Sequence, residues 1–178
     1  MEQNDWHAIV AKPSRKEPMA AAVAELLQRD PSLDAVMDMA LGQGAEAFRA
    51  SRCVAWVYEW DRALFAPYKR RFVSDFDRVA HPGVRRIYGS LMHHLLERGE
   101  YRPDCKAAEH LAEVVCSWSI EPGVKVSTLV WTLAVLGLLA RQVEWADDMI
   151  AQLVVLNDLD RSPGMRALLR RVRANHLK

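Results

Sequence analysis

Positively charged side chains recur at similar places along the sequence and could together bind an anion. Four of them follow a small residue and an apolar residue where a helix is expected to begin: Arg49, Arg85, Lys125 and Arg166. If the helices stack, these bases form a row spaced about 10 Å apart, the usual distance between packed helices. A row of this kind could bind an acidic peptide or a phosphate backbone.

A structural role for the same bases is the alternative that we favour. Each base could bind a carboxylate in the preceding turn, such as Asp77 or Asp160, and hold neighbouring helix pairs together. The bases are not accompanied by a run of Gly or Ser residues, which would help to bind an anion. Arg52 and Arg86 add positive charge nearby, so anion binding remains open.

Two of the tryptophans could anchor a protein partner. Trp60 and Trp145 fall near the expected ends of helices, where an indole is often half exposed. Trp56, Trp118 and Trp131 fall on apolar stripes, and we expect them in the core.

The other residues that could do chemistry do not form a recognisable constellation. His93 and His94 are adjacent, so on a helix their side chains diverge by about 100°. His110 lies between Cys105 and Cys116 at a spacing that fits neither a zinc ribbon nor a zinc knuckle. The sequence contains no GxSxG, GxGxxG or GxxxxGK motif. We therefore expect no catalytic residue, no metal site and no cofactor.

The composition is that of one globular domain. The chain has 178 residues, 51% of them hydrophobic and 26% charged, and 24 basic against 23 acidic side chains give a net charge of +1. These values exclude extensive disorder, and the chain is long enough to bury a core without disulfides. The charge is uneven, because residues 103–160 contain 3 bases and 9 acids, whereas residues 161–178 contain 6 bases and no acid.

Cysteine usage and hydropathy predict a cytoplasmic protein. The three cysteines form no CxxC pair, which favours reduced thiols, and the first ten residues lack the apolar region of a secretory signal. The longest uncharged stretch, Val126 to Ala140, has fifteen residues. A bilayer requires about 18–20, so we expect a buried helix there and no membrane association.

Apolar residues recur at intervals of three and four along nearly every long segment, as is typical of amphipathic helices. No segment alternates as a strand would, and no Asn-Gly or Asp-Gly pair predicts a hairpin. We therefore expect an all-α protein. The predicted helices span about 45–60, 63–79, 83–98, 104–119, 123–141, 145–158 and 163–176.

Three Pro-Gly pairs divide this pattern into repeats. Pro82, Pro122 and Pro163 stand 40 and 41 residues apart, and each is followed by Gly, an apolar residue and a base. Proline suits the first position of a helix, where its missing amide donor is not needed. A period of about 40 residues with two helices is the length typical of HEAT and armadillo repeats. The sequence therefore predicts an α-α superhelix of stacked antiparallel helix pairs.

Residues 1–44 precede this array and form a less regular pair of helices. Apolar residues from Met19 to Leu27 predict the first helix, and Asp30-Pro31 precedes the second. We expect this pair to cap the repeat array of residues 45–178 within a single domain. About the first dozen residues should pack loosely, as chain ends often do.

Four stretches of the array carry a resemblance to known proteins: Phe48 to Val57, Leu64 to Tyr68, His81 to Arg86, and the run from Val124 to Leu169. They resemble successive landmarks of a family of small HEAT-like proteins of bacteria, and the resemblance covers about residues 45–175. Some members carry the label adenylosuccinate lyase. The present chain is far shorter than such a lyase and lacks a Ser-rich signature loop with a Met-Pro and a catalytic Lys. The resemblance therefore implies a fold and no lyase activity.

These observations favour a binding function without catalysis. Stacked helix pairs form an extended surface that binds proteins or peptides, so a protein-interaction scaffold is our leading hypothesis. The alternative is a nucleic-acid-binding protein that resembles HEAT-like DNA glycosylases and uses a basic face. The acidic block of residues 103–160 and the nearly neutral total make this alternative weaker.

Overall fold

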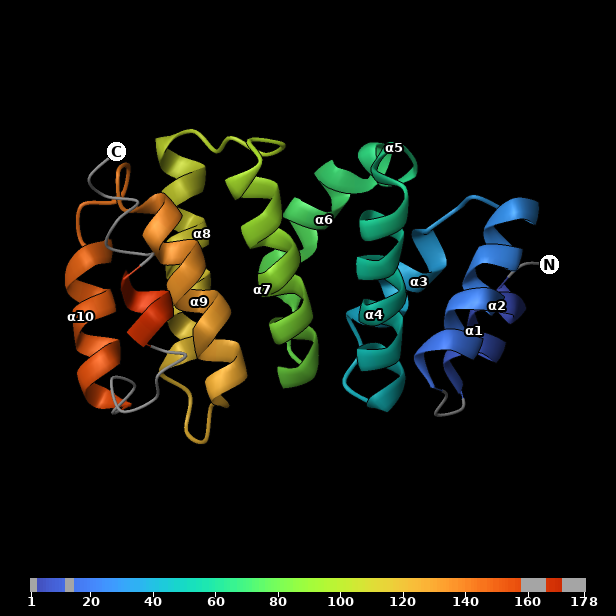
Figure 1. Cartoon of the computed structure of the whole chain (residues 1–178), viewed down its shortest axis with the longest axis horizontal. Helices are drawn as coiled ribbons and strands as arrows, with labels where there is room; N and C mark the ends of the chain where they lie inside the picture. Colours follow the sequence, from blue (N-terminus) through green and yellow to red (C-terminus); the bar gives the residue numbers. More distant parts are fainter. Residues whose placement is uncertain (1–2, 12–14, 158–165, 171–178) are drawn as a thin grey trace. The chain divides into compact units, whose positions relative to one another are not determined.

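The computed structural model describes residues 3–11, 15–157 and 166–170. Within these ranges it contains α-helices, two short 3-10 helices and no strand, which confirms the predicted all-α class (Figure 1). None of the described helices is both long enough and apolar enough to cross a membrane.

The helices follow one another as α1 (Gln3–Ala11), α2 (Lys16–Arg29), α3 (Asp34–Ala40), α4 (Ala45–Trp60), α5 (Arg62–Phe65), η1 (Ala66–Tyr68), α6 (Lys69–Asp75), η2 (Phe76–Arg78), α7 (Pro82–Glu97), α8 (Cys105–Ser119), α9 (Val126–Leu139) and α10 (Ala146–Leu156). Residues 166–170 are also helical, and the rest of the helix predicted at 163–176 lies outside the described residues. The predicted ranges 45–60, 83–98 and 104–119 agree with α4, α7 and α8 to within one residue at each end.

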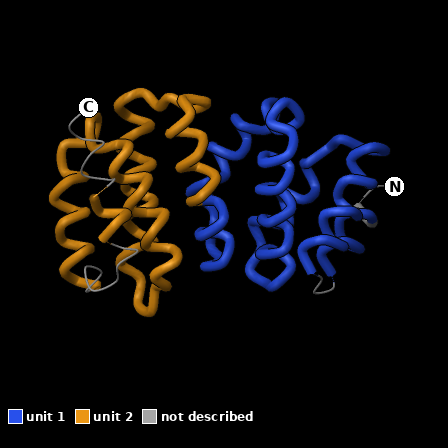
Figure 2. Tube along the Cα trace, viewed as in Figure 1, with its two compact units in different colours: residues 1–88 blue, residues 89–178 orange. Residues whose placement is uncertain are grey.

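The chain divides into two compact units, which we call the N-terminal unit (residues 1–88) and the C-terminal unit (residues 89–178) (Figure 2). The division falls inside α7. The boundary expected after residue 44 separates a capping helix pair from the repeat array, and not two compact units. It stays a prediction.

The start of the chain is better packed than its sequence predicts. Trp6 and Val10 of α1 are buried, and the Trp6 indole Nε1 donates a hydrogen bond to the Ser32 carbonyl oxygen at 3.2 Å. The expectation that about the first dozen residues pack loosely is therefore wrong for α1. Helix α1 contacts α2, α3 and α4, and these contacts bury its apolar face.

The helix predicted at 63–79 is divided into four short helices. The break coincides with Pro67, which lies in η1 and has no amide proton to donate to the preceding turn. The aromatic side chains of this segment nevertheless pack inward, because Phe65, Phe72 and Phe76 are all buried. Phe72 contacts Phe65, Phe76 and Tyr88 edge to face, with ring centroids 4.9–5.9 Å apart. Such contacts stabilise a core beyond the area that they bury.

An arginine on α6 connects this core to α3. Arg71 binds the carboxylates of Asp34 at 2.5 Å and Asp75 at 3.3 Å, and it also binds Asp38. Asp75 is buried and binds Arg78 as well, at 2.7 Å. Burial alone would lower the pKa of Arg71, but the hydrogen bonds and charges of these three carboxylates raise it overall.

The Pro-Gly pairs at 82–83 and 122–123 differ in where they lie relative to the following helix. Pro82 is the first residue of α7, as predicted, and the His81 ring accepts a hydrogen bond from the Gly83 amide at 3.0 Å, so His81 satisfies a free donor of the first turn. Pro122 instead lies in a turn, because Gly123 adopts a φ of +74° that favours glycine. Helix α9 begins only at Val126, so the prediction that Pro122 opens the helix is wrong.

In the C-terminal unit, α9 packs against α8 and α10 (Figure 1). Leu129, Leu133, Leu136 and Leu139 of α9 are buried, as the uncharged sequence predicts. Val126 belongs to the stretch predicted as a buried helix, but it is 54% exposed, because it is the first residue of α9 and lies beside the turn.

Candidate functional site

The first predicted site residue, Arg49, is engaged inside the N-terminal unit. Its Nη2 donates to the Ala11 carbonyl oxygen at 2.9 Å, and its Nε donates to the Val10 carbonyl oxygen. Both acceptors belong to the last turn of α1, where free carbonyl groups attract a cation. Arg49 therefore connects α4 to the end of α1.

Arg85 and Lys125, two other bases of the predicted row, lie at different positions relative to the starts of their helices. Arg85 lies within the first turns of α7, and its Nε donates to the Val79 carbonyl oxygen at 3.1 Å. Lys125 is exposed and precedes the first residue of α9. Arg166 is exposed on the helical residues 166–170, and Asp160, offered as a carboxylate partner, lies outside the described residues. A single row of four bases stays a prediction, whereas Arg49 and Arg85 have contacts typical of structural residues.

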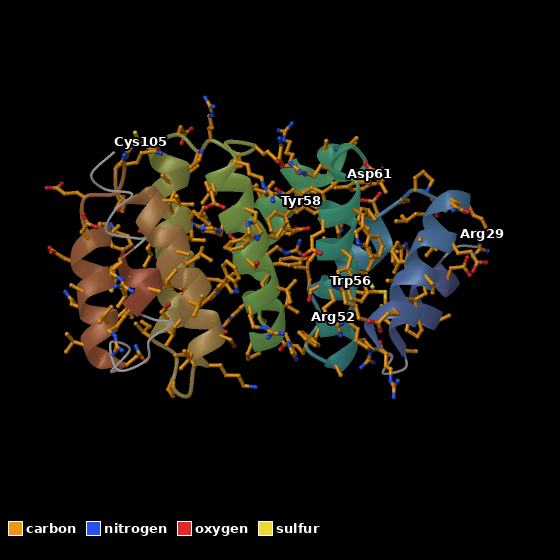
Figure 3. The ribbon with its side chains drawn as sticks, in the orientation of Figure 1. Arg29, Arg52, Trp56, Tyr58, Asp61 and Cys105 are labelled. Carbon is orange, nitrogen blue, oxygen red and sulfur yellow. The ribbon has the colours of Figure 1, made fainter. Side chains whose placement is uncertain are left out.

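Arg52 forms a ladder with two tryptophans along α4. Its guanidinium lies 4.8 Å from the ring centre of Trp56, and Trp56 stacks on Trp60 with centroids 6.0 Å apart and ring planes 15° apart. Arg52 and Trp56 follow one another along the same helix in Figure 3. Trp56 is buried, whereas Trp60 is 48% exposed, so the ladder ends in an indole that solvent reaches. This exposure agrees with the expectation for Trp60.

Arg86 lies over an aromatic ring at the start of α4. Its guanidinium is 5.6 Å from the centre of the Phe48 ring, and the same ring stacks on His81 at 6.5 Å. The structure thus brings the start of α7 to the start of α4 within the N-terminal unit. Arg49 and Arg85 each donate a hydrogen bond to a backbone carbonyl oxygen of this unit, and Arg52 and Arg86 each lie over an aromatic ring of it.

Trp145 lies at the start of α10 in the C-terminal unit. It is half-buried, and its Nε1 donates a hydrogen bond to the Glu109 carboxylate on α8. This bond holds the start of α10 against α8. Trp145 is half-buried near a helix end, as predicted, but its indole Nε1 already donates to Glu109 within the unit.

An apolar hollow in the C-terminal unit was not predicted from the sequence. It has a volume of about 600 Å³, and we define it by its lining residues: Ile120, Met149, Ala151, Gln152, Leu153, Val155 and Leu156. Ile120 is 61% exposed, Val155 81% and Leu156 71%. Single exposed apolar residues are common, but a contiguous group around a hollow is typical of an interaction site.

Acidic side chains flank this apolar hollow. Asp147 and Asp148 are exposed in the first turn of α10, one turn before Ala151 and Gln152, and Glu121 follows Ile120. The sequence signal for the hollow was the consecutive apolar run from Leu153 to Leu156, which has no polar face at the end of α10. Periodicity alone could not show which side of that run a neighbouring helix covers.

Two of the three thiols, Cys53 and Cys116, have a raised pKa. Burial raises the pKa of Cys53 to about 12, against the opposing effects of the Arg52 charge and of a backbone hydrogen bond. Burial also raises the pKa of Cys116, whereas Cys105 is exposed. The buried thiols therefore stay protonated near neutral pH.

Comparisons with known proteins identify no relative that would assign a role to these residues. No family model matches the chain, and neither a curated protein nor a solved structure is significantly similar to it.

Proposed function

We propose that the chain is a non-enzymatic protein-interaction scaffold built from HEAT-like antiparallel helix pairs. We further propose that a protein partner binds at the apolar hollow. The observation that carries this proposal is the exposure of Ile120, Val155 and Leu156 around one hollow. The packing of α8 against α9 and of α9 against α10 supports the helix-pair architecture within the C-terminal unit.

The surroundings of the hollow define the chemistry of the partner. The lining is almost entirely apolar, so it favours an apolar anchor, whose burial contributes about 25 cal/mol per Å² of area removed from water. The exposed acids Asp147 and Asp148 favour basic residues beside that anchor. The proposed partner is therefore a protein segment with aliphatic or aromatic anchors and flanking Lys or Arg residues.

Selection of peptides from a random display library on the full chain tests this proposal. Selected peptides should combine apolar anchors with basic residues and should bind the wild-type protein in solution. The double variant Val155→Asp, Leu156→Asp should weaken binding at least ~10-fold, because two charges would enter the apolar site. Val126→Asp is the matched control, since Val126 is also an exposed apolar residue but does not line the hollow.

Two results would overturn the proposal. Selected peptides whose binding is equal in the wild type and the double variant would place the binding surface elsewhere. A dimer whose formation depends on concentration and is abolished by the double variant would show that the hollow binds a second copy of the chain instead of a different partner. Analytical ultracentrifugation of the three proteins distinguishes these cases.

A further inference from the structure

Two histidines and a glutamate converge on one side of α7 in the C-terminal unit. The His94 Nδ1 atom lies 3.7 Å from Glu97 Oε2, and the His93 Nδ1 atom lies 3.9 Å from the same oxygen. The possible ligand atoms of the three side chains all lie within 4.8 Å of one another. We propose that His93, His94 and Glu97 bind a divalent transition-metal ion, and that Zn²⁺ fits this donor set.

The helical spacing explains how two diverging histidines can share one ion. Adjacent side chains on a helix point about 100° apart, so His93 and His94 alone make a poor chelate. Glu97 is four residues after His93 and three after His94, and both spacings place side chains next to each other on a helix. The carboxylate therefore completes a site that the pair of histidines does not form by itself.

The distances between the side chains are close to those of a metal centre. Zinc binds imidazole nitrogen and carboxylate oxygen at about 2.0–2.2 Å, so neighbouring ligands of a tetrahedral ion lie about 3.4 Å apart. The observed separations of 3.7 and 3.9 Å need only small side-chain rotations to reach this value. Two imidazoles and one carboxylate are a common donor set for zinc, and they leave a fourth position for water.

A buried atom of His94 supports the same assignment. Its Nδ1 is buried and has no hydrogen-bond partner within the described ranges. A buried polar atom without a hydrogen-bond partner is unfavourable and rare in folded proteins, so this atom requires an explanation. A bound ion would satisfy this nitrogen through its lone pair.

Trp131 of α9 forms a wall beside the two imidazoles. Its ring centroid lies 5.6 Å from that of His93 and 5.9 Å from that of His94. Helix α9 approaches closely here because Gly89 has no side chain, and a Cβ at that position would lie 3.2 Å from the Trp131 Cβ. The indole excludes water from one side of the site and also supplies a fluorescent reporter next to the proposed ion.

A simple ion pair is the alternative arrangement of these groups. A protonated imidazole could approach the Glu97 carboxylate, but 3.7 Å is longer than a hydrogen bond. Both arrangements therefore require the side chains to move closer together. They differ in whether a metal ion binds, and this difference is measurable.

Isothermal titration of Zn²⁺ into the full chain near neutral pH provides the test. The wild-type protein should bind one ion, and His94→Gln and Glu97→Gln should each lower the affinity at least ~10-fold, as loss of a metal-site group does. Glu97 is exposed, so Glu97→Gln should leave the fold intact, which circular dichroism verifies. His110→Gln is the matched control, because His110 is an exposed histidine of the same unit outside the cluster.

Quenching of tryptophan fluorescence by Cu²⁺ gives a second measurement. Cu²⁺ should quench the wild-type protein at the affinity lost in Glu97→Gln, and Trp131→Phe should remove most of that quenching. The proposal is wrong if Zn²⁺ does not bind at a single saturable site. It is equally wrong if Glu97→Gln binds as tightly as the wild type, or if His110→Gln loses binding to the same extent.

Discussion

The two units use different side chains to hold their helices together. The N-terminal unit relies on arginines and aromatic rings: Arg49 binds the end of α1, Arg71 binds carboxylates on α3, and Phe72 contacts three rings. The C-terminal unit relies on the aliphatic helix α9, of which Leu133 and Leu136 are fully buried. Arginine contacts and edge-to-face rings therefore add to the apolar core of the first unit, whereas aliphatic packing dominates around α9 in the second.

This difference also determines where each unit can meet a partner. In the N-terminal unit the arginines that we weighed as structural residues or as an anion-binding row have contacts within the unit. In the C-terminal unit the apolar sequence extends beyond the core, and Val155 and Leu156 reach solvent at the end of α10. An apolar surface that no helix of the described residues covers can bind a partner without first breaking an internal contact.

The largest effect is expected for the aliphatic core of the C-terminal unit. Leu133→Ala should lower the free energy of unfolding by about 2–5 kcal/mol, because it removes a fully buried side chain and leaves a cavity. Chemical denaturation measures this loss. Val126→Ala on the same helix is the control and should cost under about 0.5 kcal/mol, since Val126 is exposed. Equal losses for the two variants would contradict the assignment of their burial.

The next effect concerns the polar contacts of the N-terminal unit. Arg71→Ala should cost about 2–3 kcal/mol, between the values of exposed and buried ion pairs, because it leaves the buried Asp75 with fewer compensating charges. The loss should shrink as salt is added, which would not occur for Leu133→Ala.

Arg70→Ala is the matched control for this prediction. Arg70 is the exposed neighbour of Arg71, so its replacement should change the unfolding midpoint very little. A comparable loss in both variants would mean that the effect comes from overall charge and not from the carboxylates on α3 and α6.

A smaller effect is expected at the start of α7. Arg85→Ala should cost about 1–2 kcal/mol, within the range for leaving a hydrogen-bonding group without its partner, because the Val79 carbonyl oxygen loses its donor. Thermal unfolding measures the change, and binding of the selected peptides should stay unchanged. If stability were unaffected while binding of an acidic ligand fell, Arg85 would be a recognition residue instead of a structural one.

The smallest effect is a dependence on pH in the N-terminal unit. Burial raises the pKa of Cys53 from 9.0 to about 12, so the folded protein keeps this thiol protonated after the unfolded chain has released its proton. The contribution of this thiol to the free energy of unfolding is fully present below pH 9, and it falls as the pH rises toward 12. Between pH 8 and pH 10 the loss should be about 1 kcal/mol.

The comparison with Cys53→Ala isolates this contribution, because the other alkaline groups titrate in both proteins. The difference in unfolding free energy between the two proteins should narrow as the pH rises. A difference that is constant over this range would show that Cys53 is not buried from solvent. A thiol reagent should label Cys105 rapidly and Cys53 only after unfolding.

The sequence by itself determined the all-α class and the bounds of several helices of this protein. Apolar spacing of three and four predicts α4, α7 and α8 nearly to the residue, because a helical period depends only on local order along the chain. The same uncharged run that excludes a bilayer span predicts the buried leucines of α9. Pro67 was also a readable signal for the division of the segment after α4, since the missing amide acts locally.

Only the tertiary structure decided which surfaces are buried and which residues far apart in the sequence are in contact. Burial of Trp6, exposure of Val155 and the wall that Trp131 forms beside His94 each depend on a helix distant in sequence. Helical periodicity states which residues share a face, but it does not state whether another helix packs there. For that reason the sites predicted from the sequence consist mainly of arginines. The apolar hollow and the cluster of His93, His94 and Glu97 could be recognised only in the folded chain.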